Sequence, residues 1–193
     1  MKIALIPCGA TEWDDEGRLL GRVELQLTPE GEQRCAAWAA GLRALGLERI
    51  LHAPDELATH TAAALARELS IPTKALDDLV EVDLGLWTGL TEAQLKQRFA
   101  SAHRELRESP LNVNPPGGES LCAAADRLLA CVRKQIRRNG KKTIGVVLRP
   151  FGFALAKCAL GGSAATELWE TARHATEPVI LEYEAKTTRK AGP

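Results

Sequence analysis

The sequence lacks a net charge, a disulfide framework and an apolar run long enough to cross a membrane. Lys and Arg total 25 and Asp and Glu total 25, so no long-range field attracts nucleic acid or an anionic membrane. Arg149, Pro150 and Lys157 interrupt the most apolar stretch, residues 143–160, which therefore does not predict a membrane span. We expect neither a nucleic-acid partner nor membrane association.

The cysteines exclude further classes of protein. There are five, an odd number, and no Cys-x-x-Cys pair occurs, which argues against a disulfide scaffold and against a zinc knuckle. Reduced thiols are typical of a cytoplasmic protein. We therefore expect a cytoplasmic location, no metal and no other cofactor.

The amino-terminal segment predicts a strand and not a signal peptide. Its apolar run, residues 3–6, is shorter than the roughly 7–15 residues of a signal peptide's hydrophobic region, and Pro7 closes it. A short apolar run that ends at Pro7 and Gly9 is typical of a buried strand that leads into a loop.

Strands and helices are predicted to alternate along the chain. Thr28 and Asp55 are candidate N-caps, Pro29 suits the first helical position, and Gly46 ends the first long helix. Residues 74–90 are predicted to form a long irregular loop that runs over the sheet. The predicted strands are residues 2–6, 49–53, 143–148 and 178–183. The predicted helices are residues 29–45, 56–69, 91–99 with further helix to 108, 119–138 and 151–160.

This alternation predicts an α/β fold in three layers, with a mostly parallel central sheet flanked by helices. We expect one domain over residues 1–185 and a flexible tail over residues 186–193. Ligands of such folds bind beyond the carboxyl ends of the strands, which here are residues 7–9, 53–54 and 148–150.

Several segments around these strand ends carry a family resemblance. Residues 5–14 read LIPCGATEWD and residues 17–21 read GRLLG, where the histidine phosphatase superfamily has LIRHGETxWN and GRLQG. Residues 79–91, LVEVDLGLWTGLT, resemble the family pattern LxExDFGxWEGxT. Residues 27–31, 50–62, 116–120 and 144–149 also match family segments, and all matches keep their order. The chain thus resembles a phosphoglycerate mutase-like histidine phosphatase.

The resemblance also implies which chemistry is missing. The family transfers a phosphoryl group to a histidine, while two arginines and a second histidine neutralise its oxygens and a carboxyl acid protonates the leaving oxygen. By alignment the nucleophile falls on Cys8, the arginines on Pro7 and Leu57, and the second histidine on Arg149. The acid position, Glu81, is the one member of this set that is retained. No intact catalytic set is therefore expected.

The resemblance implies a vestigial pocket formed by Cys8, Gly9, Thr11, Leu57, Glu81 and Arg149, with Thr11 at its rim. Cys8 has two interpretations, a small buried hydrophobe or a replacement nucleophile, and the sequence after it supplies acids where a phosphate-binding loop needs a cation. Arg149 has three: it extends to solvent, pairs with Glu81, or binds a ligand. A lone guanidinium should hold phosphate only weakly.

The sequence therefore favours a catalytically inactive member that is retained as a scaffold for a small anionic ligand or a protein partner. Losing an activated nucleophile or one transition-state donor costs roughly 10²–10⁶ in rate, and here several are missing. The alternative is an active phosphatase, phosphomutase-like enzyme or other hydrolase that uses Cys8 in the same cleft. Homo-oligomers are compatible with either interpretation.

Overall fold

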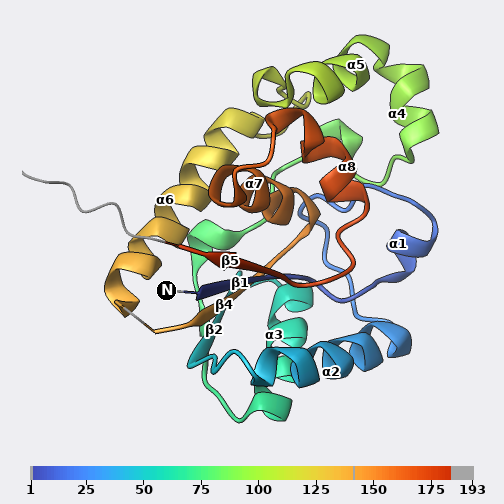
Figure 1. Cartoon of the computed structure of the whole chain (residues 1–193). Coiled ribbons are helices and arrows are strands. Elements are labelled where there is room, and N and C mark those ends of the chain that lie inside the picture. The colour runs from blue at the N-terminus through green and yellow to red at the C-terminus, as the bar shows by residue number, and fades with distance from the viewer. Residues whose placement is uncertain (1, 141, 184–193) are drawn as a thin grey trace, which may run out of the picture.

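The computed structural model describes residues 2–140 and 142–183, and its centre is a five-stranded sheet (Figure 1). The strand order is β3-β2-β4-β1-β5. β1 pairs in parallel with β4, β4 with β2, and β2 with β3, whereas β5 is antiparallel to β1. The strands are β1 (Lys2–Pro7), β2 (Arg49–His52), β3 (Thr73–Ala75), β4 (Ile144–Leu148) and β5 (Val179–Glu182).

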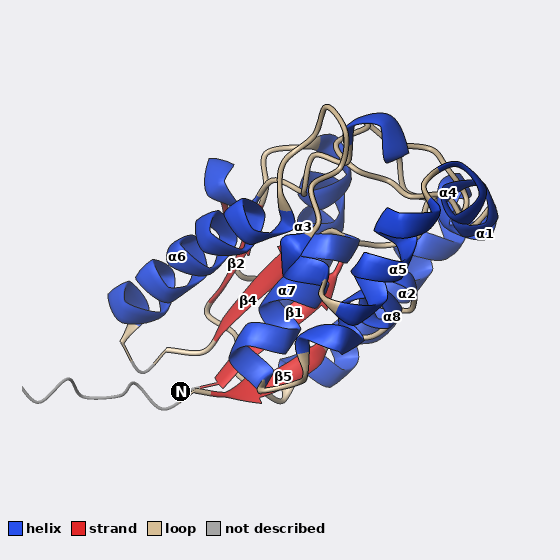
Figure 2. Cartoon of the chain, turned by 90° about the horizontal axis from the view of Figure 1, so that it is seen from above, coloured by secondary structure: helices blue, strands red, loops and turns tan. Residues whose placement is uncertain are grey.

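Helices cover both faces of this sheet (Figures 1 and 2). α2 and α3 pack on one face, and α7, with α6 and α8 beside it, packs on the other, while α4 and α5 lie beyond α8. The helices are α1 (Glu12–Asp15), α2 (Pro29–Arg43), α3 (Glu56–Leu69), α4 (Glu92–Arg98), α5 (Ala100–Glu108), α6 (Leu121–Asn139), α7 (Pro150–Gly161) and α8 (Leu168–Arg173). Short 3₁₀ turns lie at Asp77–Leu79, Gly85–Trp87, Pro110–Asn112 and Ala165–Glu167.

Side-chain caps fix where the long helices begin. Thr28 Oγ1 accepts a hydrogen bond from Gly31 N at 3.0 Å, and Asp55 Oδ1 accepts one from Ala58 N at 3.1 Å. Both predicted caps are thereby confirmed. The helix expected from residue 119 begins later, at Leu121, because the Ser120 hydroxyl takes the cap.

Three strands or helices, β3, α1 and α8, were not predicted from the sequence. β3 reads Thr73-Lys74-Ala75 with every side chain exposed, so it has no apolar pattern and forms because β2 offers a free edge. α1 has four residues and α8 has six, too short for a helical period to stand out. The remaining strands and long helices lie within a few residues of their predicted bounds, as the fold class requires.

Two further expectations bear on the whole chain. No helix in the described ranges is long and apolar enough to cross a membrane. The predicted tail, residues 186–193, lies outside the described residues, and the single domain over residues 1–185 stays a prediction.

The backbone of α2 touches the loop that follows β1. A methyl group placed on Gly31 would lie 2.5 Å from Ala10 O and 2.9 Å from Ala10 N, closer than van der Waals contact allows. Thr28 N also donates to Ala10 O at 3.0 Å. The start of α2 therefore fixes the position of the β1–α1 loop, and the close approach requires glycine at position 31.

We predict opposite effects for two Gly→Ala substitutions in α2. Gly31→Ala should lower the free energy of unfolding by about 1–3 kcal/mol, because the new methyl meets backbone that cannot rotate away. Gly41→Ala, whose new methyl group would have no neighbour within 4 Å, should raise it by about 0.5–1 kcal/mol. Urea unfolding curves of the two variants measure both changes, and equal stabilisation by both would contradict the close approach.

Candidate active site

The carboxyl ends of β1 and β4 and the start of α3 meet at one edge of the sheet. Cys8 N donates to Leu148 O at 3.0 Å, which places Cys8 beside Arg149. Gly9 N donates to Thr61 Oγ1 at 3.1 Å, and Thr61 Oγ1 donates to Leu57 O at 2.9 Å. The structure thus brings Cys8, Gly9, Leu57 and Arg149 together, and Leu57 is fully buried among them.

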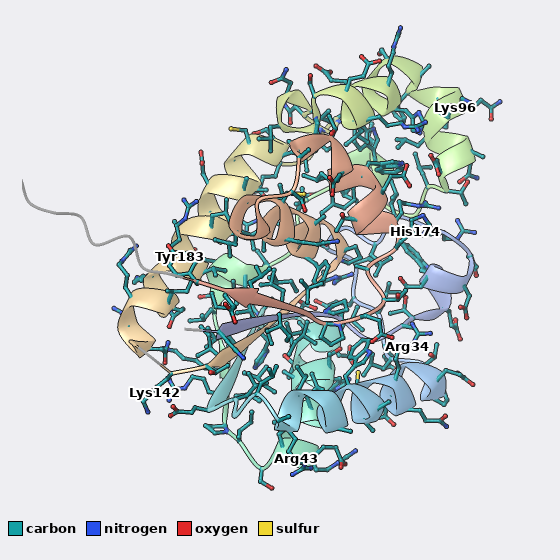
Figure 3. All side chains as sticks on the ribbon, viewed as in Figure 1. Arg34, Arg43, Lys96, Lys142, His174 and Tyr183 are labelled. Carbon is teal, nitrogen blue, oxygen red and sulfur yellow. The ribbon has the colours of Figure 1, made fainter. Side chains whose placement is uncertain are left out.

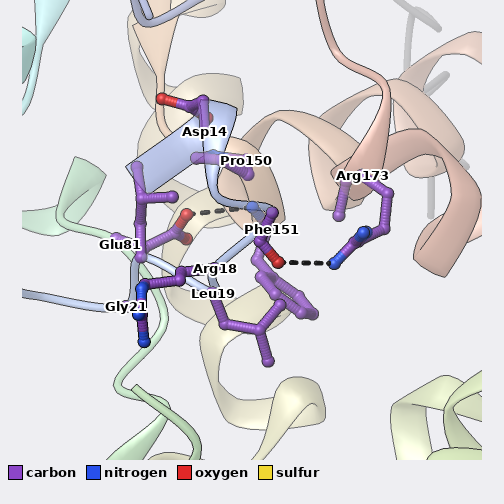
Figure 4. A pocket seen from close by; sticks show the side chains of 11 residues that line it. Asp14, Arg18, Leu19, Gly21, Glu81, Pro150, Phe151 and Arg173 are labelled. Atoms are coloured by element: carbon purple, nitrogen blue, oxygen red, sulfur yellow. Dashed lines mark hydrogen bonds between the residues drawn. The ribbon is translucent and has the colours of Figure 1, made fainter. Parts of the chain in front are cut away.

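Glu81 reaches this edge from the segment before the Gly85–Trp87 turn. Its Oε1 accepts hydrogen bonds from Val82 N at 2.7 Å and Gly152 N at 2.9 Å. Its Oε2 accepts one from Phe151 N at 2.9 Å, which Figure 4 shows as a dashed line. Two of these donors belong to the first turn of α7, where a negative charge is favoured. Burial nevertheless raises the pKa of Glu81, against the effect of these donors and of Arg149.

Arg149 is buried, with 2% of its surface exposed. Its Nη1 donates to Val23 O at 2.9 Å and lies 3.5 Å from Asp55 Oδ1. Of the three interpretations of Arg149, this burial contradicts extension to solvent, and its ion-pair partner is Asp55 instead of Glu81. Within the described residues, three buried atoms of this pair have no hydrogen-bond partner, namely Nε and Nη2 of Arg149 and Oδ2 of Asp55.

Cys8 is half-buried and keeps its proton. Burial raises the pKa of its thiol well above the usual range, and the carboxylates of Asp55 and Glu81 raise it further, while Arg149 acts in the opposite direction. The thiolate is the nucleophilic form of cysteine. Near neutral pH, Cys8 is therefore a neutral thiol and a poor nucleophile.

Thr11 lies inside the loop, and the expectation that it stands at the rim is wrong. It is fully buried, and its N–H and hydroxyl both donate to Asp14 Oδ2 at 2.7 Å. Asp14 folds back on α1 through these bonds. The pair stiffens the loop between β1 and α1 and offers little to a ligand.

Three cavities surround these residues. One of about 230 Å³ lies beside Cys8 and is lined also by Arg34, Trp38 and Arg173. Arg34 lies on α2, and Figure 3 shows it at the same side of the molecule as His174, just after α8. A smaller one of about 80 Å³ is lined by Arg18, Glu81, Phe151 and Arg173, among others (Figure 4). The third, of about 300 Å³, is lined by Arg22, Glu24, Pro54, Asp55, Val80, Glu81 and Arg149.

Two charged residues of this region were not predicted to belong to the site. Asp55 was predicted to be a helix cap, but its second contact, with Arg149, was not predicted. Arg173 lies at the end of the unpredicted α8, and its Nη1 donates to Gly17 O at 3.2 Å. Farther from the strand ends, His103 Nε2 lies 3.0 Å from Glu92 Oε1, and this bond lowers the pKa of Glu92.

No group of three His, Cys, Asp or Glu side chains in the described part of the chain is arranged to hold a metal ion. The arrangement instead offers buried charges, a neutral thiol and backbone donors that are already occupied.

Known proteins resemble the chain in sequence. The profile of the histidine phosphatase superfamily (branch 1) matches residues 3–191. Phosphoserine phosphatase 1 of Hydrogenobacter thermophilus is 25% identical over 169 residues, which cover 88% of this chain and 80% of that protein. The bifunctional protein Rv2228c of Mycobacterium tuberculosis is 34% identical over 134 residues, which cover 69% of this chain and 35% of that protein. The match thus spans about a third of the latter's length.

Solved structures share the fold. Bacillus stearothermophilus YhfR superimposes with a TM-score of 0.81 at 24% identity, covering 95% of this chain and 92% of that one. The mycobacterial glucosyl-3-phosphoglycerate phosphatase in complex with VO3 gives 0.75 at 22% identity, with coverages of 86% and 83%. The predicted fold class, a phosphoglycerate mutase-like α/β fold with a mostly parallel sheet, is confirmed.

The neutral state of Cys8 leads to a prediction about its reactivity. Iodoacetamide should modify Cys8 more slowly than Cys122, which is exposed, and the rate at Cys8 should keep rising as the pH passes the ordinary thiol pKa of about 8.5. Peptide mass spectrometry after timed labelling measures both rates. Fast labelling of Cys8 near pH 6 would show an activated thiolate and contradict the prediction.

Proposed function

The chain belongs to the histidine phosphatase superfamily, and we propose that it is a catalytically silent member that keeps the scaffold for binding. The half-buried position of Cys8, close to the carboxylates of Asp55 and Glu81, is the observation that carries the proposal. By resemblance, Cys8 stands at the position of the family's nucleophile, and its raised pKa leaves little thiolate for attack on phosphorus.

The positions that resemble the family's anion-binding set support the same reading. Pro7 lies within β1 and Leu57 is a buried aliphatic residue, so neither supplies a cation. Arg149 is charged, but its Nη1 already donates to Val23 O and forms an ion pair with Asp55. A transferring phosphoryl group needs several donors aimed at its oxygens, and one partly engaged guanidinium replaces them poorly.

Glu81, at the position of the family's acid, is occupied as well. An acid that protonates a leaving group must be free to move its proton to the substrate. Here both carboxylate oxygens accept backbone N–H donors, and these bonds hold the start of α7. Its retention is therefore explained by structure, without a reaction.

The competing proposal is an active phosphomonoester hydrolase or phosphomutase-like enzyme. Arg149 favours it, because this cation lowers the pKa of Cys8. The relatives named above as phosphatases also belong to the same superfamily. The burial of Cys8 and the nearby carboxylates outweigh this one cation, and we prefer the silent scaffold.

We predict that the purified protein does not turn over phosphomonoesters above background. A generic aryl phosphate and phosphoserine are the substrates, with release of inorganic phosphate as the readout. Intact-protein mass spectrometry after quenching should find no phosphoryl-enzyme, because no activated nucleophile faces the cleft.

Two controls make this result decisive. Phosphoserine phosphatase 1 of Hydrogenobacter thermophilus, assayed in parallel, tests the assay itself. The Cys8→Ala variant tests the competing proposal, because turnover by the unaltered chain that Cys8→Ala abolishes would establish an active cysteine enzyme.

A further inference from the structure

We propose that the outer edge of β5 binds an extended segment of a partner protein in which basic and apolar residues alternate. The segment pairs with β5 as an added strand. Its apolar side chains pack in a groove beside α2, and its basic side chains lie in an acidic groove beside α7 and α8. Neither groove includes Cys8, Glu81 or Arg149, so the inference does not depend on whether the chain is catalytically silent.

β5 forms one edge of the sheet. It pairs with β1 over the whole of Val179–Glu182, and among the described residues no strand pairs with its other side. Figure 1 shows β5 at the front of the sheet, with α7 and α8 above it and α2 below. β5 reads VILE, without the lysine or proline that commonly protects an edge. Such an edge offers its backbone N–H and C=O groups to another strand.

The groove on the α2 side is apolar. It has a volume of about 410 Å³, and Ile180 borders it with 38% of its surface exposed. Two opposite charges, Arg34 and Glu177, also line it. Its other lining residues are Ala37, Trp38, Gly41, Leu42, Leu45 and Pro178. Exposed apolar surface of this kind marks sites of protein interaction, and apolar side chains of an added strand would be buried here.

The groove on the α7 and α8 side is acidic. It also has a volume of about 410 Å³, and Val179 borders it. Its charged or titratable residues are Lys157, Glu167, Glu170, His174 and Glu177. Three carboxylates against one ammonium group leave two negative charges, or one when His174 is protonated. Basic side chains are therefore the complementary ones.

The alternation of side chains along β5 connects the two grooves. Successive side chains of a strand point to opposite faces of the sheet, and Val179 and Ile180 accordingly border different grooves. Neighbouring side chains of an added strand would likewise enter different grooves. This determines the pattern of the partner, a basic residue at every second position with apolar residues between.

A second copy of this chain is a less favourable occupant of the edge. Its β5 would bring Glu177 and Glu182 to an edge that already carries both acids, and like charges on paired strands are destabilising. The sequence VILE also supplies no basic side chain to the acidic groove. Charge therefore favours a basic segment of another protein.

The experiment titrates the full chain into a fluorescein-labelled peptide, Lys-Val-Lys-Val-Lys-Val, and follows fluorescence anisotropy. Its length of about six residues is that of a typical strand. Lys-Lys-Lys-Val-Val-Val has the same composition without the alternation, and Glu-Val-Glu-Val-Glu-Val has the opposite charge. We expect saturable binding of the first peptide and dissociation constants at least about tenfold higher for the other two. Amide hydrogen exchange at residues 179–182 should slow in the complex.

Three variants locate the binding. Glu167→Gln combined with Glu170→Gln removes two charges of the acidic groove and should raise the dissociation constant about three- to tenfold. The matched control, Glu68→Gln combined with Glu108→Gln, removes two exposed acids outside both grooves and should bind as the unaltered chain does. Ile180→Glu should weaken binding although it adds an acid, because the valines of the peptide would then pack against a charge.

Each contrary outcome overturns the proposal. Absence of saturable binding would refute it directly. Equal binding of the peptide without alternation, or tighter binding by Ile180→Glu, would show an unspecific attraction between charges. Unchanged hydrogen exchange at residues 179–182 in the saturated complex would place the peptide elsewhere. A dimer of the free chain that Ile180→Glu dissociates would show that a second copy occupies the edge.

Turnover of phosphomonoesters is measured separately, which distinguishes this inference from the proposed function. A silent chain that does not bind the alternating peptide refutes the inference about β5 alone. An active chain that binds the peptide refutes the proposed silence and supports the inference about β5.

Discussion

The carboxylate of Glu81 is the constraint on which the geometry of the strand ends depends. It joins the segment after β3 to the first turn of α7 through two backbone donors, Phe151 N and Gly152 N, across about seventy residues of sequence. Arg149 is the residue immediately before α7, so this attachment also fixes where its side chain begins. A buried carboxylate without these donors would be unfavourable, and the helix start without an acceptor would be unfavourable too.

The sequence predicted most strands and the long helices, because short local patterns of residues determine where they begin and end. The apolar run before Pro7, the caps at Thr28 and Asp55 and the order of the family segments all lie in short stretches of chain. The mostly parallel sheet and the helices on both of its faces follow from them by general rules of α/β architecture, whereas the order of the strands was not predicted.

The environment of the charged residues was harder to predict, because it depends on contacts between distant segments. Arg149 looked like a residue at a strand end, free to reach solvent or Glu81, since nothing local reveals that Val23 and Asp55 surround it. The resemblance placed Thr11 at the rim of the pocket, yet its bonds to Asp14 hold it inside the loop. The raised pKa of Cys8 likewise arises from burial that no motif encodes.

The loop after β1 is held by its backbone more than by its side chains. Cys8 N donates to Leu148 O, Gly9 N donates to Thr61 Oγ1, and Ala10 O accepts from Thr28 N. None of these bonds uses the side chain at position 8. Natural variation can therefore exchange that side chain without moving the loop. In such a site the backbone determines the shape and the side chains determine the chemistry. A lineage can therefore lose one reaction and acquire another ligand while the scaffold remains the same.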